Sequence, residues 1–138
     1  MRDMIQTVGT IRIAVRADSR KTAEKALGIL LAFLSLAQSQ DGAPKWDGEW
    51  MSVSAYFGDV SKRGYWLSVC TAGERLAKDT SDEDRKFLEG LDFRMEYYFT
   101  DMGEYGMSRE HMANTHEAGT PLETMTSETL SPSWWESY

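Results

Sequence analysis

Four segments of the chain alternate apolar and polar residues, and this period of two constrains the fold more than any other feature. The segments are residues 10–16, 49–57, 65–71 and 92–100. In such a segment one set of side chains lies on a buried face, while the neighbouring set stays in solvent. The alternation therefore predicts four strands that share one buried face.

Leucine and alanine recur at helical spacing between the first two of these strands, over residues 23–34. Asp18 or Ser19 can cap the start of this helix, because either side chain can accept a hydrogen bond from a free backbone N–H. The turn-forming residues 40–42 predict its end. We therefore expect one long, well-buried helix between the first and second strands.

A second helix is predicted between the last two strands, after a short helical turn near residues 74–78. Thr80 and Glu83 have capping-box spacing at its start, and Gly90 marks its end. The order strand, helix, strand, strand, helix, strand predicts an α+β fold, a ferredoxin-like split βαβ sandwich. Its four-stranded antiparallel sheet has the expected order 4-1-3-2, with both helices on one face. The predicted core contains Ile13, Leu27, Leu30, Val53, Leu67, Val69, Leu88 and Phe93.

The charge is uneven along the chain. The net charge is −7, yet residues 101–138 contain seven acids and a single base, Arg109. This layout argues against a general nucleic-acid binder, which needs a basic footprint. It is compatible with a basic partner, with a protein that copies the charge of nucleic acid, or with a solubilising tail. We therefore divide the chain into a ferredoxin-like domain, residues 1–106, and an acidic C-terminal extension, residues 107–138.

The extension is expected to contain a short helix from Ser108 through His116, followed by a tail that contains tryptophan. A tail that only adds solubility needs charge but no aromatic residues. We therefore expect the tryptophans to anchor the segment, on the domain's own sheet or on a partner, and the acids to face a basic protein surface. The candidate partner-binding residues are Glu110, Glu117, Glu123, Trp134 and Trp135.

The face of the sheet opposite the helices combines aromatic residues with arginines. Such a face stacks bases in RNA-recognition domains. Residues 62–67 resemble the start of an RNP1 element but lack its small residue, so the aromatics fall out of register. The face can equally be covered by the C-terminal segment, by a second copy or by a partner protein. Its candidate residues are Arg12, Arg16, Trp50, Trp66, Arg94 and Tyr98.

No residue set points to catalysis. Cys70 is the single cysteine, which excludes an internal disulfide and favours a reducing cytoplasm. His111 and His116 are five residues apart and would lie on different faces of a helix. The apolar stretch 23–37 is interrupted by polar residues, and no leader with a basic start and an apolar run is visible. We expect no catalytic residue, cofactor, metal or membrane association.

Several short motifs occur in the order found in a family of small phage- and plasmid-borne ferredoxin-like proteins of unknown function. The resemblance covers residues 43–106. It implies the fold, an origin on a mobile genetic element and a location in the cytoplasm of a bacterial host. The family's aromatic-Ser-Pro-Pro motif is replaced here by Gly73-Glu74-Arg75. The resembling motifs are Lys45-Trp46-Asp47, Thr71-Ala72, Leu91-Asp92-Phe93, Tyr97 or Tyr98, and Gly103-Glu104.

The expected function is that of a non-catalytic protein-binding module encoded by a phage or mobile element. By analogy with small acidic phage proteins, it would act as a stoichiometric, anti-CRISPR-like inhibitor of a host nucleic-acid-binding defence complex. Its carboxylates would occupy phosphate-like positions on a basic partner. The alternatives are a single-stranded nucleic-acid binder that uses the aromatic and arginine sheet face, or a self-assembling structural protein, including a homodimer.

Overall fold

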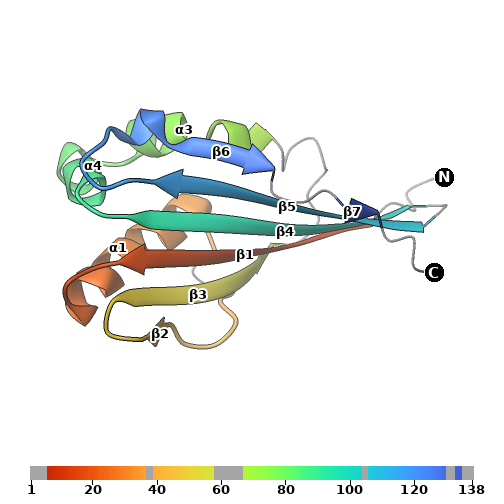
Figure 1. Cartoon of the computed structure of the whole chain (residues 1–138), viewed down its shortest axis with the longest axis horizontal. Helices are drawn as coiled ribbons and strands as arrows, with labels where there is room; N and C mark the ends of the chain where they lie inside the picture. Colours follow the sequence, from red (N-terminus) through yellow and green to blue (C-terminus); the bar gives the residue numbers. More distant parts are fainter. Residues whose placement is uncertain (1–5, 37–38, 58–66, 104–105, 130–132, 135–138) are drawn as a thin grey trace.

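The computed structural model describes residues 6–36, 39–57, 67–103, 106–129 and 133–134, with side chains for residues 9–36, 39–56, 67–98 and 111–129. Its described parts form an α+β protein in which one antiparallel sheet carries helices on one face (Figure 1). The view in Figure 1 is onto the face that the helices leave open. The predicted α+β class and the one-sided sheet are therefore confirmed.

The described sheet contains seven strands, and every pairing between them is antiparallel. Six strands follow the spatial order β2-β3-β1-β4-β5-β6, and the seventh, β7, pairs with β5. Their bounds are β1 Gln6–Arg16, β2 Lys45–Trp46, β3 Trp50–Phe57, β4 Phe93–Gly103, β5 Gly106–His116, β6 Thr126–Thr129 and β7 Ser133–Trp134.

The α-helices that lie wholly within the described residues are α1 Arg20–Leu34, α3 Ala72–Asp79 and α4 Asp82–Glu89, and a 3-10 helix, η2, spans Leu122–Thr124. Ser19 caps α1 by accepting a hydrogen bond from the Thr22 backbone N–H, as predicted. The helix ends earlier than predicted, because Ser35 adopts a left-handed conformation with φ 58°. The cap of α4 is Ser81, one residue beyond the predicted Thr80, and Gly90 ends this helix as expected.

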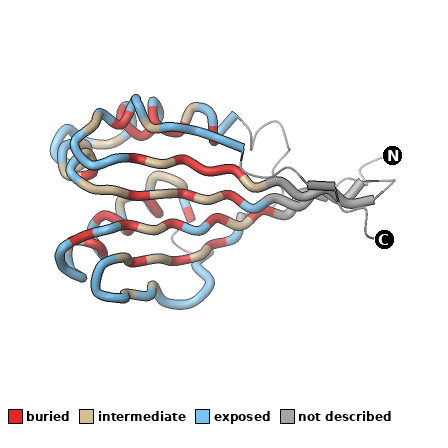
Figure 2. Tube along the Cα trace, viewed as in Figure 1, coloured by how far each residue is buried: buried red, intermediate tan, exposed pale blue. Residues whose placement is uncertain are grey.

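The core lies between the sheet and the helices (Figure 2). Alternate residues of β1, β3 and β4 are buried against the helices, in the phase that the sequence predicts. The helix α1 buries alanine and leucine from one side against them. Of the eight predicted core residues, Leu67 is the exception, with 59% of its surface exposed. The buried ones are Ile13, Leu27, Leu30, Val53, Val69, Leu88 and Phe93.

The third predicted strand, residues 65–71, is not a strand where it is described. Residues 67–70 form a helical turn that leads into α3. Val69, Ala72 and Leu76 are three and four residues apart and bury the same side of this helical segment. Leu67 and Cys70 consequently face solvent.

The place beside β1 that was predicted for this segment is taken by β3. The pairing of β1 with β4 agrees with the prediction. The sheet is thus larger than the four-stranded ferredoxin-like sheet, and its order differs from 4-1-3-2.

The helix predicted from Ser108 through His116 is also wrong, because these residues belong to β5. This strand pairs with β4 over its whole length, from Phe93 opposite His116 to Gly103 opposite Gly106. The domain boundary predicted after residue 106 therefore lies at the start of β5, a strand that pairs with β4 in the same sheet. No helix in the described parts of the chain is long and apolar enough to span a membrane.

Candidate binding surfaces

Glu96 lies at the centre of the open sheet face and connects the charged side chains around it. Its carboxylate accepts a hydrogen bond from His111 Nε2 at 2.8 Å and one from the Tyr98 hydroxyl at 3.2 Å. Arg94 Nε lies 3.4 Å and Arg12 Nη1 3.9 Å from the other carboxylate oxygen. The structure therefore brings together three predicted face residues, Arg12, Arg94 and Tyr98, around a carboxylate that was not predicted as a site residue.

The environment of Glu96 favours its ionised form. Burial opposes ionisation, but the hydrogen bond from His111, the charge of Arg94 and the hydrogen bond from Tyr98 outweigh it. The pKa of Glu96 is consequently held below its ordinary value. Only 17% of the Glu96 side chain is exposed, so its carboxylate is largely enclosed by these partners.

His111 was missed as a face residue because it was assigned to a helix. On β5 it lies directly opposite Tyr98, and the two rings stack with their centroids 4.3 Å apart. His116 lies five positions further along the strand and is therefore buried on the other face. The sequence signal for a strand here is the alternation of Met112 and Asn114 with His111 and Ala113. This signal is weak, because the residues that point into the core include the polar Asn114 and His116.

Arg16 and Trp50 lie opposite each other at the end of the β1–β3 pair. Arg16 Nη2 lies 2.6 Å from the Glu49 carboxylate, and Nη1 lies 3.9 Å from that of Asp92. Each of the three face arginines thus has a carboxylate within ion-pair distance. The predicted face residue Trp66 lies outside the described residues.

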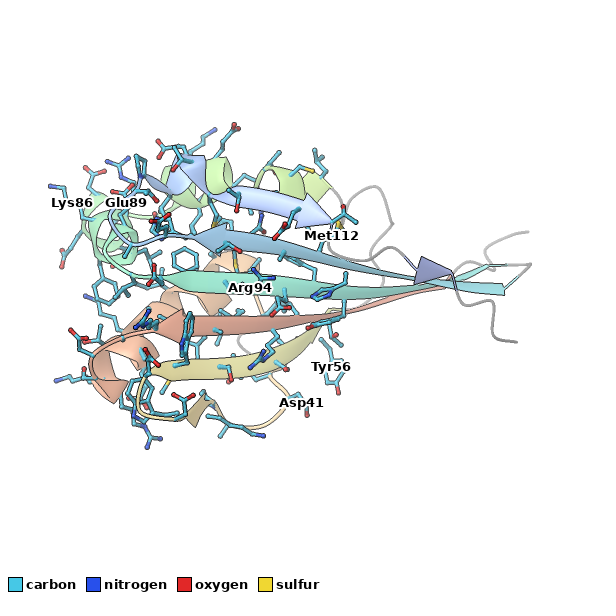
Figure 3. All side chains as sticks on the ribbon, viewed as in Figure 1. Asp41, Tyr56, Lys86, Glu89, Arg94 and Met112 are labelled. Atoms are coloured by element: carbon cyan, nitrogen blue, oxygen red, sulfur yellow. The ribbon has the colours of Figure 1, made fainter. Side chains whose placement is uncertain are left out.

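The far end of the face exposes aromatic surface. Tyr56 is 50% exposed, and its hydroxyl donates a hydrogen bond of 3.2 Å to Asp41. Figure 3 shows these two side chains together at the end of β3, and Arg94 near the middle of the sheet. The negative charge of Asp41 raises the pKa of the Tyr56 hydroxyl. The open face therefore combines aromatic surface with three arginines that each lie near a carboxylate.

The segment after β5 is firmly attached to the junction between α4 and β4. Leu122 is fully buried, and its backbone N–H donates to the Glu89 carboxylate at 3.0 Å. Gly119 N–H donates to the Glu89 carbonyl at 2.7 Å, and Ala118 N–H donates to Asp92 Oδ1 at 2.7 Å. Residues 117–122 are thus held by a buried side chain and several hydrogen bonds.

The buried His116 ring also holds this segment in place, through hydrogen bonds and ring stacking. Its nitrogens lie 2.7 Å from the Leu91 carbonyl oxygen and 2.8 Å from that of Thr120. The ring also stacks on Phe93, with centroids 4.8 Å apart. His116 therefore bridges the end of α4 and the loop before η2.

Three carboxylates lie in this attached segment or after it: Glu117 within it, Glu123 in η2 beside Leu122, and Glu128 on β6. We call these three residues the acidic edge. All three residues are exposed, and they form no ion pair among the described residues. Glu128 lies on β6, the last strand of the described sheet on that side. Two of the predicted partner-binding residues are therefore exposed at this place, Glu117 within the attached segment and Glu123 directly after it.

The remaining predicted partner-binding residues are only partly described. Glu110 lies in β5 opposite Phe99, and Trp134 lies in β7 opposite Ser108, but their side chains are outside the described set. Trp135 lies outside the described residues. The strands β6 and β7 pair with β5 within the sheet, so these two parts of the C-terminal segment extend the sheet and do not cover its open face.

Taken together, the described elements define an α+β protein with a one-sided antiparallel sheet and two exposed polar surfaces, the open sheet face and the acidic edge. Within the described residues, no group of three or more histidine, cysteine, aspartate or glutamate side chains has an arrangement suited to a metal ion. No protein-family model, curated protein or solved structure matches the chain.

Proposed function

We propose that the protein is a non-catalytic protein-binding module whose acidic edge contacts a basic surface on its partner. The observation that carries this proposal is the attachment of the acidic segment by the fully buried Leu122 and by the hydrogen bonds to Glu89 and Asp92. A segment that only adds solubility does not need a buried anchor. Attachment fixes the backbone that carries the carboxylates, which reduces the entropy lost on binding.

The charge of the acidic edge suits a basic partner. Exposed carboxylates that form no ion pair within the described parts of the chain attract a positive surface at long range and accelerate encounter. The chain as a whole adds to this effect, because its net charge is −7. We expect binding to weaken as salt rises, since such charges are screened beyond ~8 Å at physiological ionic strength.

The strand β6 offers a second means of contact at the same edge. Among the described strands it has a neighbour on one side only, β5. Its free edge can pair with an extended segment of a partner through backbone hydrogen bonds. Backbone pairing would supply affinity, and the carboxylates would supply the preference for a basic partner.

The more specific form of the proposal is a phage or mobile-element protein that inhibits a host nucleic-acid-binding defence complex. It rests on the motif resemblance and on the chemistry of carboxylates, which can occupy phosphate positions in a basic groove. In this form the protein and the nucleic acid compete for one groove. A stoichiometric loss of nucleic-acid binding by the complex, measured by fluorescence anisotropy, is the expected result.

The test compares two variants of equal net charge. The edge variant carries Glu117→Gln, Glu123→Gln and Glu128→Gln, and the control carries Glu24→Gln, Glu74→Gln and Glu83→Gln at exposed positions elsewhere. Proteins from the host are captured on the wild-type chain, and the affinity of a purified captured protein is then measured for each variant. We expect the edge variant to lose affinity through slower association, while the control binds like the wild type.

Equal losses in both variants would mean that net charge alone drives binding and would contradict a specific edge. Unchanged affinity in the edge variant would place the contact elsewhere. Capture of a nucleic acid that binds the purified chain directly would favour the sheet face as the functional surface.

A further inference from the structure

The open sheet face contains a hollow of about 390 Å³. Its floor is formed by two short side chains, Ser52 on β3 and Ala14 on β1, which lie opposite each other. Lys45 continues the same row on β2, and Arg94 continues it on β4. Two small residues between two long cationic ones therefore leave the hollow in the sheet surface.

The hollow is locally positive on a chain that is acidic overall. Three cations border it, Arg12, Lys45 and Arg94, against two carboxylates, Asp47 and Glu96. Lys45 is exposed and makes no ion pair with the described residues, and Arg12 approaches Glu96 no closer than 3.9 Å. Both therefore keep hydrogen-bond donors for a ligand.

The two carboxylates are already engaged in other contacts. Asp47 Oδ1 accepts the backbone N–H groups of Trp50 at 2.7 Å and of Glu49 at 2.9 Å. Glu96 accepts hydrogen bonds from His111 and Tyr98. Both carboxylates stay charged, so three cations and two carboxylates leave one net positive charge at the hollow. Neither carboxylate forms an ion pair with Lys45 among the described residues, which leaves the Lys45 ammonium group open to a ligand.

The wall of the hollow supplies a flat apolar surface. Trp50 borders it and is partly exposed, so its indole can stack on a planar ring. Lysine and arginine bind carboxylate and phosphate groups by charge-assisted hydrogen bonds. A volume of about 390 Å³ falls within the usual range for small-molecule sites.

We propose that this hollow binds a small ligand in which a planar ring carries one carboxylate or phosphate group. The anionic group lies between Lys45 and Arg12, over the floor of Ser52 and Ala14. Arg94 contributes its charge only, because its Nη1 donates to Thr115 Oγ1 on β5 at 2.8 Å and its Nε lies beside Glu96. The ring lies against Trp50. This site is separate from the acidic edge, and the proposal stands independently of the proposed protein partner.

The test is an amide chemical-shift titration of the intact chain with four probes: adenosine monophosphate, indole-3-acetate, adenosine and inorganic phosphate. We expect one of the two anionic ring compounds to shift the amides of Ala14, Ser52 and Trp50 with at most millimolar Kd. A response to the phosphate compound alone, or to the carboxylate alone, identifies the source of the anionic group. Adenosine lacks the anionic group and inorganic phosphate lacks the ring, so each should bind more weakly than the ring anion.

Two variants separate the site from general attraction. Lys45→Met should weaken binding about tenfold, as expected for one lost charge-assisted hydrogen bond. Lys21→Met, an exposed lysine on α1, should leave affinity unchanged. Ser52→Leu fills the floor and should abolish binding, and the amide spectrum of this variant reports whether it is folded.

Four results would overturn the proposal. The first is that neither ring anion shifts any amide at millimolar concentration. The second and third are that adenosine binds as tightly as adenosine monophosphate, if the phosphate compound binds, or that inorganic phosphate binds as tightly as the ring anion. The fourth is that Lys45→Met and Lys21→Met lose the same affinity.

Discussion

At the scale of single residues, the ionised Glu96 network should make stability depend on pH. The folded-state pKa of Glu96 lies below its ordinary value, so its stabilisation is complete above the unfolded pKa of about 4.3 and is lost as pH falls through the folded pKa. Glu96→Gln should therefore lower the free energy of unfolding near pH 7 by about 1.5–3 kcal/mol. The difference from the wild type should shrink as pH falls below about 4. Urea unfolding of both proteins across this pH range measures it.

Glu24→Gln is the control for this measurement, because Glu24 is exposed and forms only an i,i+4 ion pair of 3.5 Å with Arg20. Exposed pairs of this kind contribute about 0.3–0.5 kcal/mol. A difference for Glu96→Gln that stays constant between pH 7 and pH 3 would show that the stabilisation does not come from the ionised carboxylate.

Asn114 provides a second prediction at this scale, because its fully buried side chain joins three parts of the chain. Its amide nitrogen donates to the Val69 carbonyl at 2.9 Å and to the Ser127 hydroxyl at 2.7 Å, and its oxygen accepts from the Tyr97 hydroxyl at 2.6 Å. Asn114→Ala should lower the free energy of unfolding by about 2–4 kcal/mol, because its buried partners lose their hydrogen bonds. Thermal or urea unfolding measures this change. Ser127→Ala should cost less, because Ser127 is exposed and water can replace its hydroxyl. Equal costs would contradict the structural role of the Asn114 amide.

At the scale of elements, the packing of α3 against η2 depends on the absence of a side chain at Gly73. A Cβ atom at this position would lie 2.6 Å from the Leu122 carbonyl oxygen, and a backbone atom cannot move aside cheaply. Gly73→Ala should therefore destabilise the protein by about 1–3 kcal/mol, as overpacking does. Differential scanning calorimetry would measure this destabilisation as a lower melting temperature.

Gly28 in α1 is the matched control for this substitution. A Cβ atom there meets nothing within 4 Å. Gly28→Ala should stabilise the protein by about 0.5–1 kcal/mol, because alanine loses less backbone entropy in a helix. A stabilising Gly73→Ala would mean that α3 and η2 do not pack as described.

At the scale of the whole molecule, the acidic segment should contribute to folding as well as to binding. Deleting residues 120–138 removes the fully buried Leu122 and the strand β6. The loss of Leu122 alone corresponds to about 2–5 kcal/mol, and Leu122→Ala tests that part separately. Denaturation midpoints that stay unchanged in both variants would mean that the segment is an inert tail.

The overall charge leads to a prediction about nucleic acid. With a net charge of −7, and with each face arginine near a carboxylate, the isolated protein should bind DNA or RNA weakly near physiological salt. Fluorescence anisotropy with a labelled single-stranded oligonucleotide measures this. Submicromolar binding that is lost in Arg12→Ala would instead favour the sheet face as a nucleic-acid surface.

Local patterns in the sequence were sufficient for the strands β1, β3 and β4 and for the start of α1. Their alternation and the Ser19 cap depend only on residues close in the chain, so each element could be predicted with its buried side. The same alternation placed Arg12, Arg94 and Tyr98 on the open face. The exposed Glu117 and Glu123 were predicted from charge alone.

Only the tertiary structure decided the helical turn at residues 67–70 and the strand β5. The inward side of β5 includes Asn114 and His116, and burying such polar groups is favourable only when distant residues satisfy them. Their partners include Val69, Tyr97 and Leu91, which are remote from them in sequence. The Glu96–His111 contact and the hollow between Lys45 and Arg94 also could not be predicted from the sequence. Both arise from strand register, which brings together side chains that no local pattern connects.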